Sequence, residues 1–573
     1  MSRVLAFLAL LAGVAPSLAG QSTAELDRTF TRVRALATAP AVAMAVVQRG
    51  RVVYSNVAGF TDLEHRVAAT RTTRFDWASV AKQFTAYAVS LLVQRGVVGI
   101  DDDVRRWLPA LDLGGARVTV RQLISHTSGL EDGDGLMVLA GWRPGEVVRH
   151  ADLVPLLARQ QHLRFAPGSE HAYSNGGYSL LVEVVERASG QSFSAFTDSA
   201  IFRPLGMSST QFVDGASSRI PHRAMPYWPN ASGVMSPSTN DLYPGAGGLF
   251  STVGDMALWM AHVMSPQRDV AATLRLREVG VLSSGEPLTY AWGLSRMMDR
   301  GQEVYLHSGS GPAVAAQLVM YPALGLGVVA ATAGDAGVDP SVLARTAVDV
   351  FVGKRLGPRP SPTGQRMLMI TDAMTRDVPV ESRGQQATPT EMDALVGNYR
   401  MADSTVLSIR RAGGRLEFAY GARPPWMPLH PLGSGRFVRV PWWEVLSPEE
   451  GALRITRTAR SLRMGGDSIH VAPRIPDRTF PAELARRYEG HYYSDELEAV
   501  YEVRHRDDRL ELRHPRHGVM ALVPLDGETF AVEGEGIVRA RFTSGGERMI
   551  GLELQARSWG VTAGFRRVDV QGR

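Results

Sequence analysis

The sequence contains no cysteine, and only two of its 62 basic residues are lysines, Lys82 and Lys354. The lack of cysteine excludes disulfide frameworks, thiol nucleophiles and cysteine-ligated metals. A formal net charge of +5 is small for 573 residues, and no basic run is interleaved with aromatic residues, so we expect no nucleic-acid partner. After the first residues no apolar run reaches membrane-spanning length, so we expect no transmembrane anchor.

The N-terminus has the order typical of a secretory signal. Arg3 precedes an apolar run from Val4 to Val14, and Ser17-Leu18-Ala19 supplies the small residues of a cleavage site. We therefore predict a signal peptide at residues 1–19 and an exported protein, periplasmic or secreted.

Residues 23–355 read as one mixed domain of helices and strands. The pattern predicts a hairpin over 41–56, a long amphipathic helix from Ser79 to Gly96, and strands near Tyr305, at 315–321 and at 326–332. A final helix is expected after the cap Asp339. Residues 356–388 contain a proline-rich stretch and are predicted to be a linker, so we expect the first domain to fold without the C-terminal part of the chain.

Two all-β modules are predicted beyond the linker, at 389–475 and 480–573. Short alternating strands fill both, and they form a tandem repeat. Gly397-Asn398-Tyr399 is echoed 93 residues later by Gly490-His491-Tyr492, and Pro431 by Pro524 at the same offset. Each unit is expected to be a small antiparallel barrel or sandwich.

Ser79 and Lys82 are the first candidates for chemistry. At a spacing of three on a helix they share one face. A serine hydroxyl needs a nearby base, and a lysine serves only if its pKa is lowered. A capping serine beside a solvated lysine is the simpler alternative for such a short motif. Arginine cannot be deprotonated in a protein. A chain that uses arginine almost everywhere but lysine at 82 therefore favours the catalytic interpretation.

Further candidates lie downstream. Tyr173, followed by Asn175, could relay protons if Lys82 lowers its pKa, and Asn175 could orient Lys82 or bind a substrate amide. His307-Ser308-Gly309-Ser310 places small residues on a strand edge, where a backbone N–H could complete an oxyanion hole with that of Ser79.

In this order the three motifs resemble those of the penicillin-recognising, serine β-lactamase-like hydrolases, which include class C β-lactamases, D-aminopeptidases and β-lactamase-fold esterases. The segments at 119–130, 203–207 and 247–251 also resemble this family. The resemblance implies an α+β fold: an antiparallel sheet flanked by helices plus a helical lobe, with the site between them. Ser79, Lys82 and Tyr173 would be catalytic. Asn175, His307, Ser308, Gly309 and Ser310 would bind substrate or the oxyanion, with no metal or cofactor.

One position departs from the family pattern. His307 stands where β-lactamases usually carry a lysine that attracts a substrate carboxylate, and a mostly neutral histidine does this less well. We therefore expect a peptidase or esterase acting on a small-molecule or peptide acyl substrate, more than an efficient β-lactamase. The alternative is a penicillin-binding or sensing protein without turnover, whose β modules bind a ligand. The sequence leaves the substrate and the oligomeric state open.

Overall fold

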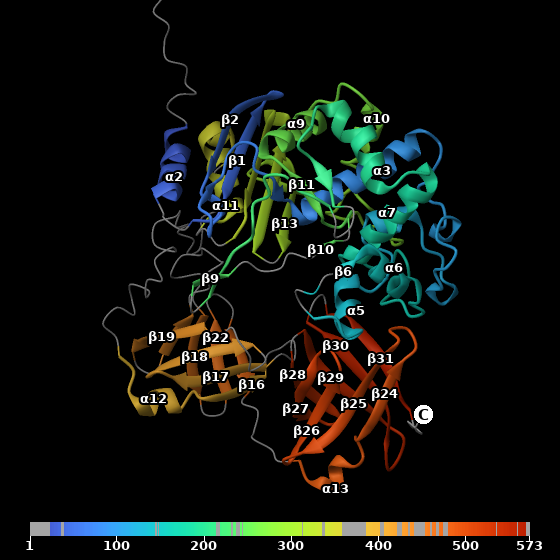
Figure 1. Cartoon of the computed structure of the whole chain (residues 1–573), viewed down its shortest axis with the longest axis vertical. Coiled ribbons are helices and arrows are strands. Elements are labelled where there is room, and N and C mark those ends of the chain that lie inside the picture. Colours follow the sequence, from blue (N-terminus) through green and yellow to red (C-terminus); the bar gives the residue numbers. More distant parts are fainter. Residues whose placement is uncertain are drawn as a thin grey trace, which may run out of the picture.

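The computed structural model describes residues 23–357 and 386–568, apart from short internal segments at 36–38, 144–145, 147, 214–217, 231–232, 236–240, 243, 312, 335–337, 401–405, 421–426, 434–435, 440–452, 459–460, 466–468, 474–479, 535 and 558–559. The predicted signal peptide and most of the predicted linker lie outside the described residues. Within the described part of the chain, no helix is both long and apolar enough to cross a membrane. Figure 1 shows a mixed N-terminal part above two all-β modules.

A six-stranded antiparallel sheet forms the centre of the N-terminal part, in the order β12-β13-β14-β15-β1-β2. Its strands are β1 (Val42–Gln48), β2 (Arg51–Ala58), β12 (Ser295–Asp299), β13 (Gln302–Gly311), β14 (Val314–Tyr321) and β15 (Leu326–Thr332). The expected hairpin and the three later strands are confirmed.

The central strand β1 is apolar on both faces because both faces are covered. Val42, Met44 and Val46 pack in one hydrophobic cluster with α2 (Ala24–Ala35) and α11 (Pro340–Val352). Ala43 and Ala45 join the larger cluster on the opposite face, with α3 and α9. Asp339 caps α11 as expected, since its side chain accepts from the Ser341 amide.

Helices form the lobe beside the sheet (Figure 1). The lobe comprises α4 (Val120–Ile124), α5 (Gly133–Leu139), α6 (His150–Ala158), α7 (Asn175–Ser189), α8 (Phe193–Thr197) and α10 (Val270–Arg275). Helix α9 (Val253–Met264) packs on the sheet, and α3 (Lys82–Gln94) lies between the sheet and the lobe. The helix expected from Ser79 begins at Lys82, after a 3₁₀ turn over Ala78–Ala81. Nearly all of α3 is buried, so it is not amphipathic: it runs between the sheet and the lobe.

Short strands complete this part: β3 (Phe60–Asp62), β4 (Val67–Ala68), β5 (Phe75–Asp76), β6 (Val148–Arg149), β7 (Gln211–Phe212), β8 (Trp228–Asn230), β9 (Gly233–Met235), β10 (Asp241–Leu242) and β11 (Leu249–Ser251). Strand β11 lies between β5 and β7. This small sheet carries the chain into the Ser79 turn.

In the part of the chain that the structure describes, each β module has eight strands. The first, after α12 (Pro389–Asp393), comprises β16 (Gly397–Arg400), β17 (Val406–Ala412), β18 (Arg415–Tyr420), β19 (Met427–Gly433), β20 (Arg436–Arg439), β21 (Leu453–Thr458), β22 (Ser461–Gly465) and β23 (Ile469–Pro473). The second, after α13 (Ala482–Ala485), is a closed barrel of β24 (Gly490–Ser494), β25 (Ala499–Arg506), β26 (Arg509–His514), β27 (Gly518–Asp526), β28 (Thr529–Glu533), β29 (Ile537–Ser544), β30 (Met549–Ala556) and β31 (Thr562–Val568).

The repeat read from the sequence has a structural counterpart. Gly397 and Gly490 open the first strand of each module with φ angles of 149° and 147°. The tyrosine two residues later donates in both modules to a carbonyl four residues back. A register shift follows Pro431 in β19 and Pro524 in β27. The two modules therefore share details of backbone geometry as well as sequence.

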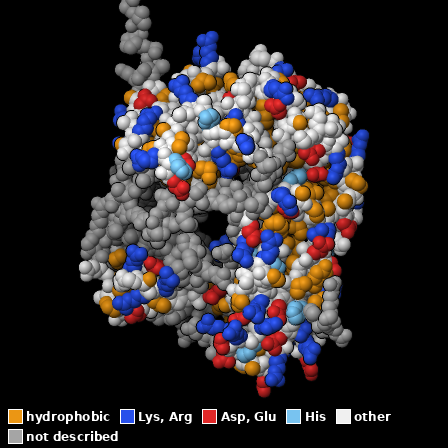
Figure 2. Space-filling view, in the orientation of Figure 1, with side chains coloured by type: hydrophobic (Ala, Val, Ile, Leu, Met, Phe, Trp, Pro, Cys, Tyr) orange, Lys and Arg blue, Asp and Glu red, His pale blue; other side chains and the backbone are white. Residues whose placement is uncertain are grey.

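The closed barrel packs against the helical lobe. One hydrophobic cluster continues from the lobe into the barrel, and Figure 1 shows α5 beside β30 and β31. In Figure 2 the surface of the lobe continues into that of the barrel on the right of the view. This shared cluster joins the first domain and the barrel in space through α5, and our expectation that the first domain folds without the C-terminal part stays a prediction.

Candidate active site

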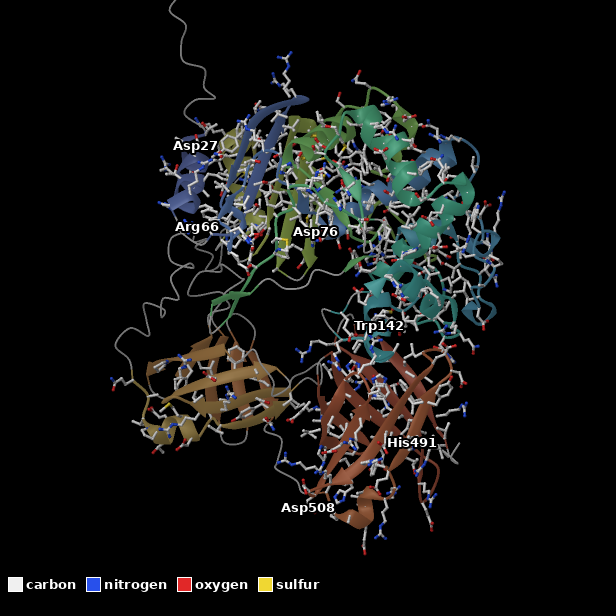
Figure 3. The ribbon with its side chains drawn as sticks, in the orientation of Figure 1. Asp27, Arg66, Asp76, Trp142, His491 and Asp508 are labelled. Atoms are coloured by element: carbon white, nitrogen blue, oxygen red, sulfur yellow. The ribbon has the colours of Figure 1, made fainter. Side chains whose placement is uncertain are left out.

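The turn that carries Ser79 is fixed on both sides. The Asp76 carboxylate accepts from the Ala78 amide at 2.8 Å, and Ala78 has a positive φ of 42°. The indole N–H of Trp77 donates to the Ser251 carbonyl in β11 at 3.0 Å. Asp76 is labelled in Figure 3, at the end of β5. A strained, doubly anchored turn presents Ser79 at a defined position.

The Lys82 amine lies at the centre of the site and is fully buried. Its Nζ is 3.1 Å from Ser79 Oγ, 2.7 Å from Asn175 Oδ1 and 2.8 Å from the Ala246 carbonyl oxygen. The last two partners can only accept a hydrogen bond. A neutral amine therefore donates both protons to them and directs its lone pair at the Ser79 hydroxyl.

Burial also prepares Lys82 as a base. Loss of solvation lowers the pKa of the Lys82 amine to about 7, against the opposing charges of Asp132 and Asp134. Near neutral pH a large fraction of the amine is thus deprotonated. The alternative of a solvated surface lysine does not describe Lys82, whereas Lys354 is exposed.

An acidic pair behind Asn175 was not recognised in the sequence. The Asn175 amide N–H donates to Asp132 Oδ2 at 2.6 Å, and its side-chain Nδ2 donates to Asp134 Oδ2 at 2.8 Å. Burial raises the pKa of Asp132. The two acids sit in a Glu-Asp-Gly-Asp-Gly loop, where an aspartate before a helix signals only a cap. Their contact with α7 depends on the fold.

Tyr173 hydrogen-bonds Ser79, and its ring centre lies 4.8 Å from Lys82 Nζ. We expected this phenol to relay protons if Lys82 lowered its pKa. Burial instead raises it well above its ordinary value. Tyr173 therefore stays protonated near neutral pH, and Lys82 is the better proton acceptor.

The predicted strand segment lies beside the Ser79 turn. Strand β12 pairs with β13 only as far as Leu306. Beyond Leu306, the edge of β13 that does not pair with β14 is therefore the edge on the side of the turn. A Cβ on Gly309 would lie 2.4 Å from the Trp77 carbonyl oxygen, which explains the glycine. Ser308 and Ser310 are exposed on this strand. The oxyanion role of the backbone at Ser310 stays a prediction.

His307 is buried and both its nitrogens have partners. Nε2 lies 3.0 Å from Tyr290 Oη, and Nδ1 lies 2.6 Å from the Ser308 carbonyl oxygen. Burial lowers the pKa of His307 to about 4. Both nitrogens of this neutral ring bond within the protein, and contact of His307 with a substrate stays a prediction.

Comparison with known proteins agrees with this geometry. The family model described as Beta-lactamase matches residues 26–351, more than half of the chain. The chain belongs to the β-lactamase family. The match includes every candidate residue of the site, and both β modules lie beyond it.

Relatives within and around the family differ in how much they share. The chain is 29% identical to penicillin-binding protein 4* of Bacillus subtilis over 293 residues, 48% of this chain and 63% of that protein. It is 26% identical to a D-aminopeptidase of Brucella anthropi over 468 residues, 80% of each chain. The structure of an octameric penicillin-binding protein homologue from Pyrococcus abyssi matches with a TM-score of 0.51 and 18% identity, covering 87% of this chain and 99% of the other, which shows the fold alone.

In this β-lactamase-family chain His126 contacts the segment that carries Tyr173. Its Nδ1 accepts from the Ser174 amide at 3.1 Å, and its ring centre is 4.3 Å from that of Tyr173. Burial holds the pKa of His126 well below its usual range. His126 is therefore a neutral ring packed against Tyr173.

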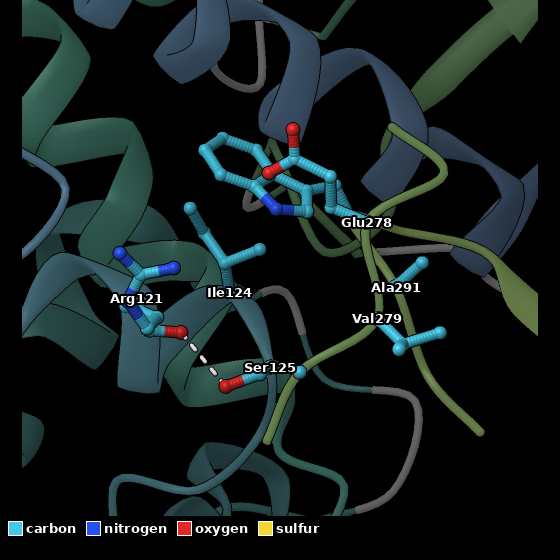
Figure 4. Close-up of a pocket in the computed structure, with 8 residues that line it drawn as sticks. Arg121, Ile124, Ser125, Glu278, Val279 and Ala291 are labelled. Atoms are coloured by element: carbon cyan, nitrogen blue, oxygen red, sulfur yellow. Dashed lines mark hydrogen bonds between the residues drawn. The ribbon is translucent and has the colours of Figure 1, made fainter. Parts of the chain in front are cut away.

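A small pocket of about 40 Å³ lies elsewhere on the lobe, lined by Arg121, Ile124, Ser125, Glu278, Val279, Gly280, Ala291 and Trp292 (Figure 4). The Ser125 hydroxyl donates to the Arg121 carbonyl at 2.8 Å, so the wall is held by its own backbone. Ser79 does not line this pocket. We assign it no part in the chemistry.

Proposed function

We propose that this chain is a serine hydrolase that forms an acyl-enzyme on Ser79 and cleaves an ester or amide bond. The observation that carries the proposal is the position of the buried Lys82 amine, whose Nζ lies 3.1 Å from Ser79 Oγ and also contacts two groups that can only accept a hydrogen bond. A positioned base of this kind is what a serine needs to become nucleophilic.

The reaction follows from these positions. Lys82 accepts the Ser79 proton as Oγ bonds to the substrate carbonyl carbon. Backbone amides of Ser79 and of the β13 edge at Ser310 stabilise the oxyanion. The Tyr173 phenol passes a proton to the leaving group and is reprotonated by Lys82. Water then attacks the acyl-enzyme with Lys82 again as base, which releases the acid and regenerates Ser79.

A peptide or amide substrate is favoured among acyl donors. The Brucella anthropi relative that shares 80% of this chain's length is a D-aminopeptidase. His307 is neutral and both its nitrogens bond within the protein, so it provides no cation for a substrate carboxylate. We therefore propose an aminopeptidase or amidase type of substrate with a D residue at the cleaved position, with esters as weaker alternatives.

Intact-protein mass spectrometry with turnover assays tests this function. The purified chain is mixed with D- and L-alanine p-nitroanilide, a p-nitrophenyl ester and benzylpenicillin. We expect acylation that is lost in Ser79→Ala and steady-state release from the D-anilide. Acylation without turnover on every substrate would indicate a binding or sensing protein instead. Labelling that persists in Ser79→Ala would contradict the assignment of the nucleophile.

We also propose that the protein is exported, on the strength of residues 1–19. Expression of the full chain in a Gram-negative host, followed by fractionation, tests this. We expect the mature protein outside the cytoplasm, with a mass that fits cleavage after Ala19. Retention of the uncleaved chain in the cytoplasm would contradict it.

A further inference from the structure

Helix α5 connects the closed barrel with the active site. At its C-terminal end the Tyr501 hydroxyl donates to the Leu139 carbonyl at 3.1 Å, and His517 Nε2 lies 2.9 Å from the Val138 carbonyl oxygen. Carbonyls in the last turn of a helix lack partners within the helix. The barrel supplies a partner for the Leu139 carbonyl and a further one for the Val138 carbonyl, which also accepts from the Gly141 amide at 2.9 Å.

The turn after α5 fits closely against the barrel. A Cβ on Gly141 would lie 2.0 Å from His514 Cε1. Next to it, the Arg516 guanidinium stacks over the Trp142 ring at 4.0 Å and pairs with Glu146 at 2.5 Å. Trp142 is labelled at this junction in Figure 3. These contacts fix the position of α5 relative to the barrel.

At its other end, α5 carries the acidic pair. Asp132 caps the helix and accepts from the Asp134 amide at 3.0 Å. Asp134 in turn accepts from Asn175 Nδ2. A side-chain amide can be turned either way, so an acceptor at Nδ2 is what directs Oδ1 of Asn175 to Lys82. If the amide turned over, its NH₂ group would draw the Lys82 lone pair away from Ser79.

We propose that the closed barrel, through α5, holds Lys82 in its reactive orientation, with Asp134 as a positioning residue that acts through Asn175. The proposal rests on the proposed function. It assigns the barrel a part in the acylation step itself, in addition to any part in substrate recognition.

The link through Asp134 is tested by a double-mutant cycle in the full chain. The readout is the acylation rate of Ser79 with a fluorophosphonate probe, per folded molecule. Asp134→Ala should lower this rate on the order of 10²-fold, as a misplaced base does. Asp134→Asn keeps an acceptor oxygen and should retain most of it. In an Asn175→Ala background, Asp134→Ala should have little further effect, since its route to Lys82 is already gone.

The link through the barrel is tested with a matched pair of glycines. Gly141 and Gly285 have φ angles of 98° and 89°, but a Cβ on Gly285 would meet nothing within 4 Å. Alanine thus imposes similar backbone strain at both positions and an interdomain clash only at Gly141. Gly141→Ala should slow acylation about 10-fold or more, and Gly285→Ala should not. Tyr501→Phe, which removes one hydrogen bond, should show a smaller loss of the same kind.

Thermal unfolding of every variant is measured alongside, so that rates refer to folded protein. Two results would overturn the proposal: additive losses in the cycle, or a Gly141→Ala variant that acylates like the parent. Failure of the proposed function itself looks different, because the parent and Ser79→Ala would then be equally unlabelled by the probe.

Discussion

Tyr290 Oη lies 3.0 Å from Nε2 of His307, on the side of the ring opposite to the Ser308 carbonyl. A hydroxyl donor on Nε2 and a carbonyl acceptor on Nδ1 together select the neutral form of the ring. Protonation would place a second N–H against the phenol in a buried site that already contains Lys82.

This arrangement predicts a loss of stability in acid. The pKa of His307 is about 4 in the folded chain, below the ordinary value of 6.5 that applies when the chain is unfolded, so the unfolded chain binds the proton more tightly. Above pH 6.5 the neutral His307 does not lower the free energy of unfolding. As the pH falls from 6.5 to about 4, the free energy of unfolding decreases by about 3 kcal/mol in total because of this residue.

Replacing His307 tests that contribution. His307→Gln should have a smaller difference in free energy of unfolding between pH 7 and pH 4.5 than the parent, measured by urea denaturation. Part of the acid effect should remain, because burial lowers the pKa of His262 and His514 in the same direction. Equal pH dependence in both proteins would show that His307 titrates normally.

Lys82→Arg should abolish most acylation. The guanidinium remains protonated and cannot accept the Ser79 proton, which should cost on the order of 10²–10⁴ in rate. Arginine is also broader than the enclosed amine, so Lys82→Met serves as a second variant that lacks the base without burying a charge. Lys354→Arg, at an exposed position, is the matched control and should leave the acylation rate unchanged. A Lys82→Met variant that acylates at the parent rate would move the base elsewhere.

Tyr173→Phe should affect amides more than activated esters. Because burial keeps the phenol protonated, its use is to protonate the leaving group, which an amine requires and p-nitrophenolate does not. The ratio of kcat/KM for an anilide to that for a p-nitrophenyl ester should fall by about 10-fold or more. If both substrates lose equally, Tyr173 acts before the leaving group departs.

Removing both β modules should loosen α5. A chain ending at Gly357 loses the hydrogen bond from Tyr501 to the Leu139 carbonyl and the contact of His517 with the Val138 carbonyl, and it exposes apolar surface of the shared cluster. We expect a lower midpoint of thermal unfolding and faster hydrogen exchange across residues 130–142 than in the full chain. Exchange in β1, which is remote from the barrel, is the internal reference. Unchanged exchange at 130–142 would mean that the lobe holds α5 by itself.

Local sequence patterns predicted much of the fold and part of the candidate site. The hairpin of β1 and β2 follows from the apolar run that ends at the Arg49-Gly50 turn, and the spacing of Ser79 and Lys82 suffices to bring them into contact. Asp132 and Asp134 were missed because their meaning depends on α7, about forty residues later. The high pKa of Tyr173 was also missed, since burial is a property of the packed site.

The two modules of the internal repeat differ at the position that contacts the end of α5 in the closed barrel. The register of each module places one residue opposite the repeated tyrosine: Tyr501 opposite Tyr492 in the barrel, and Leu407 opposite Tyr399 in the first module. Leucine has no hydroxyl to offer a helix end, so the first copy cannot form the bond that Tyr501 makes with Leu139. At this position one side chain thus decides which of the two copies can bind the end of α5, while the strand pairing around the repeated tyrosine is the same in both.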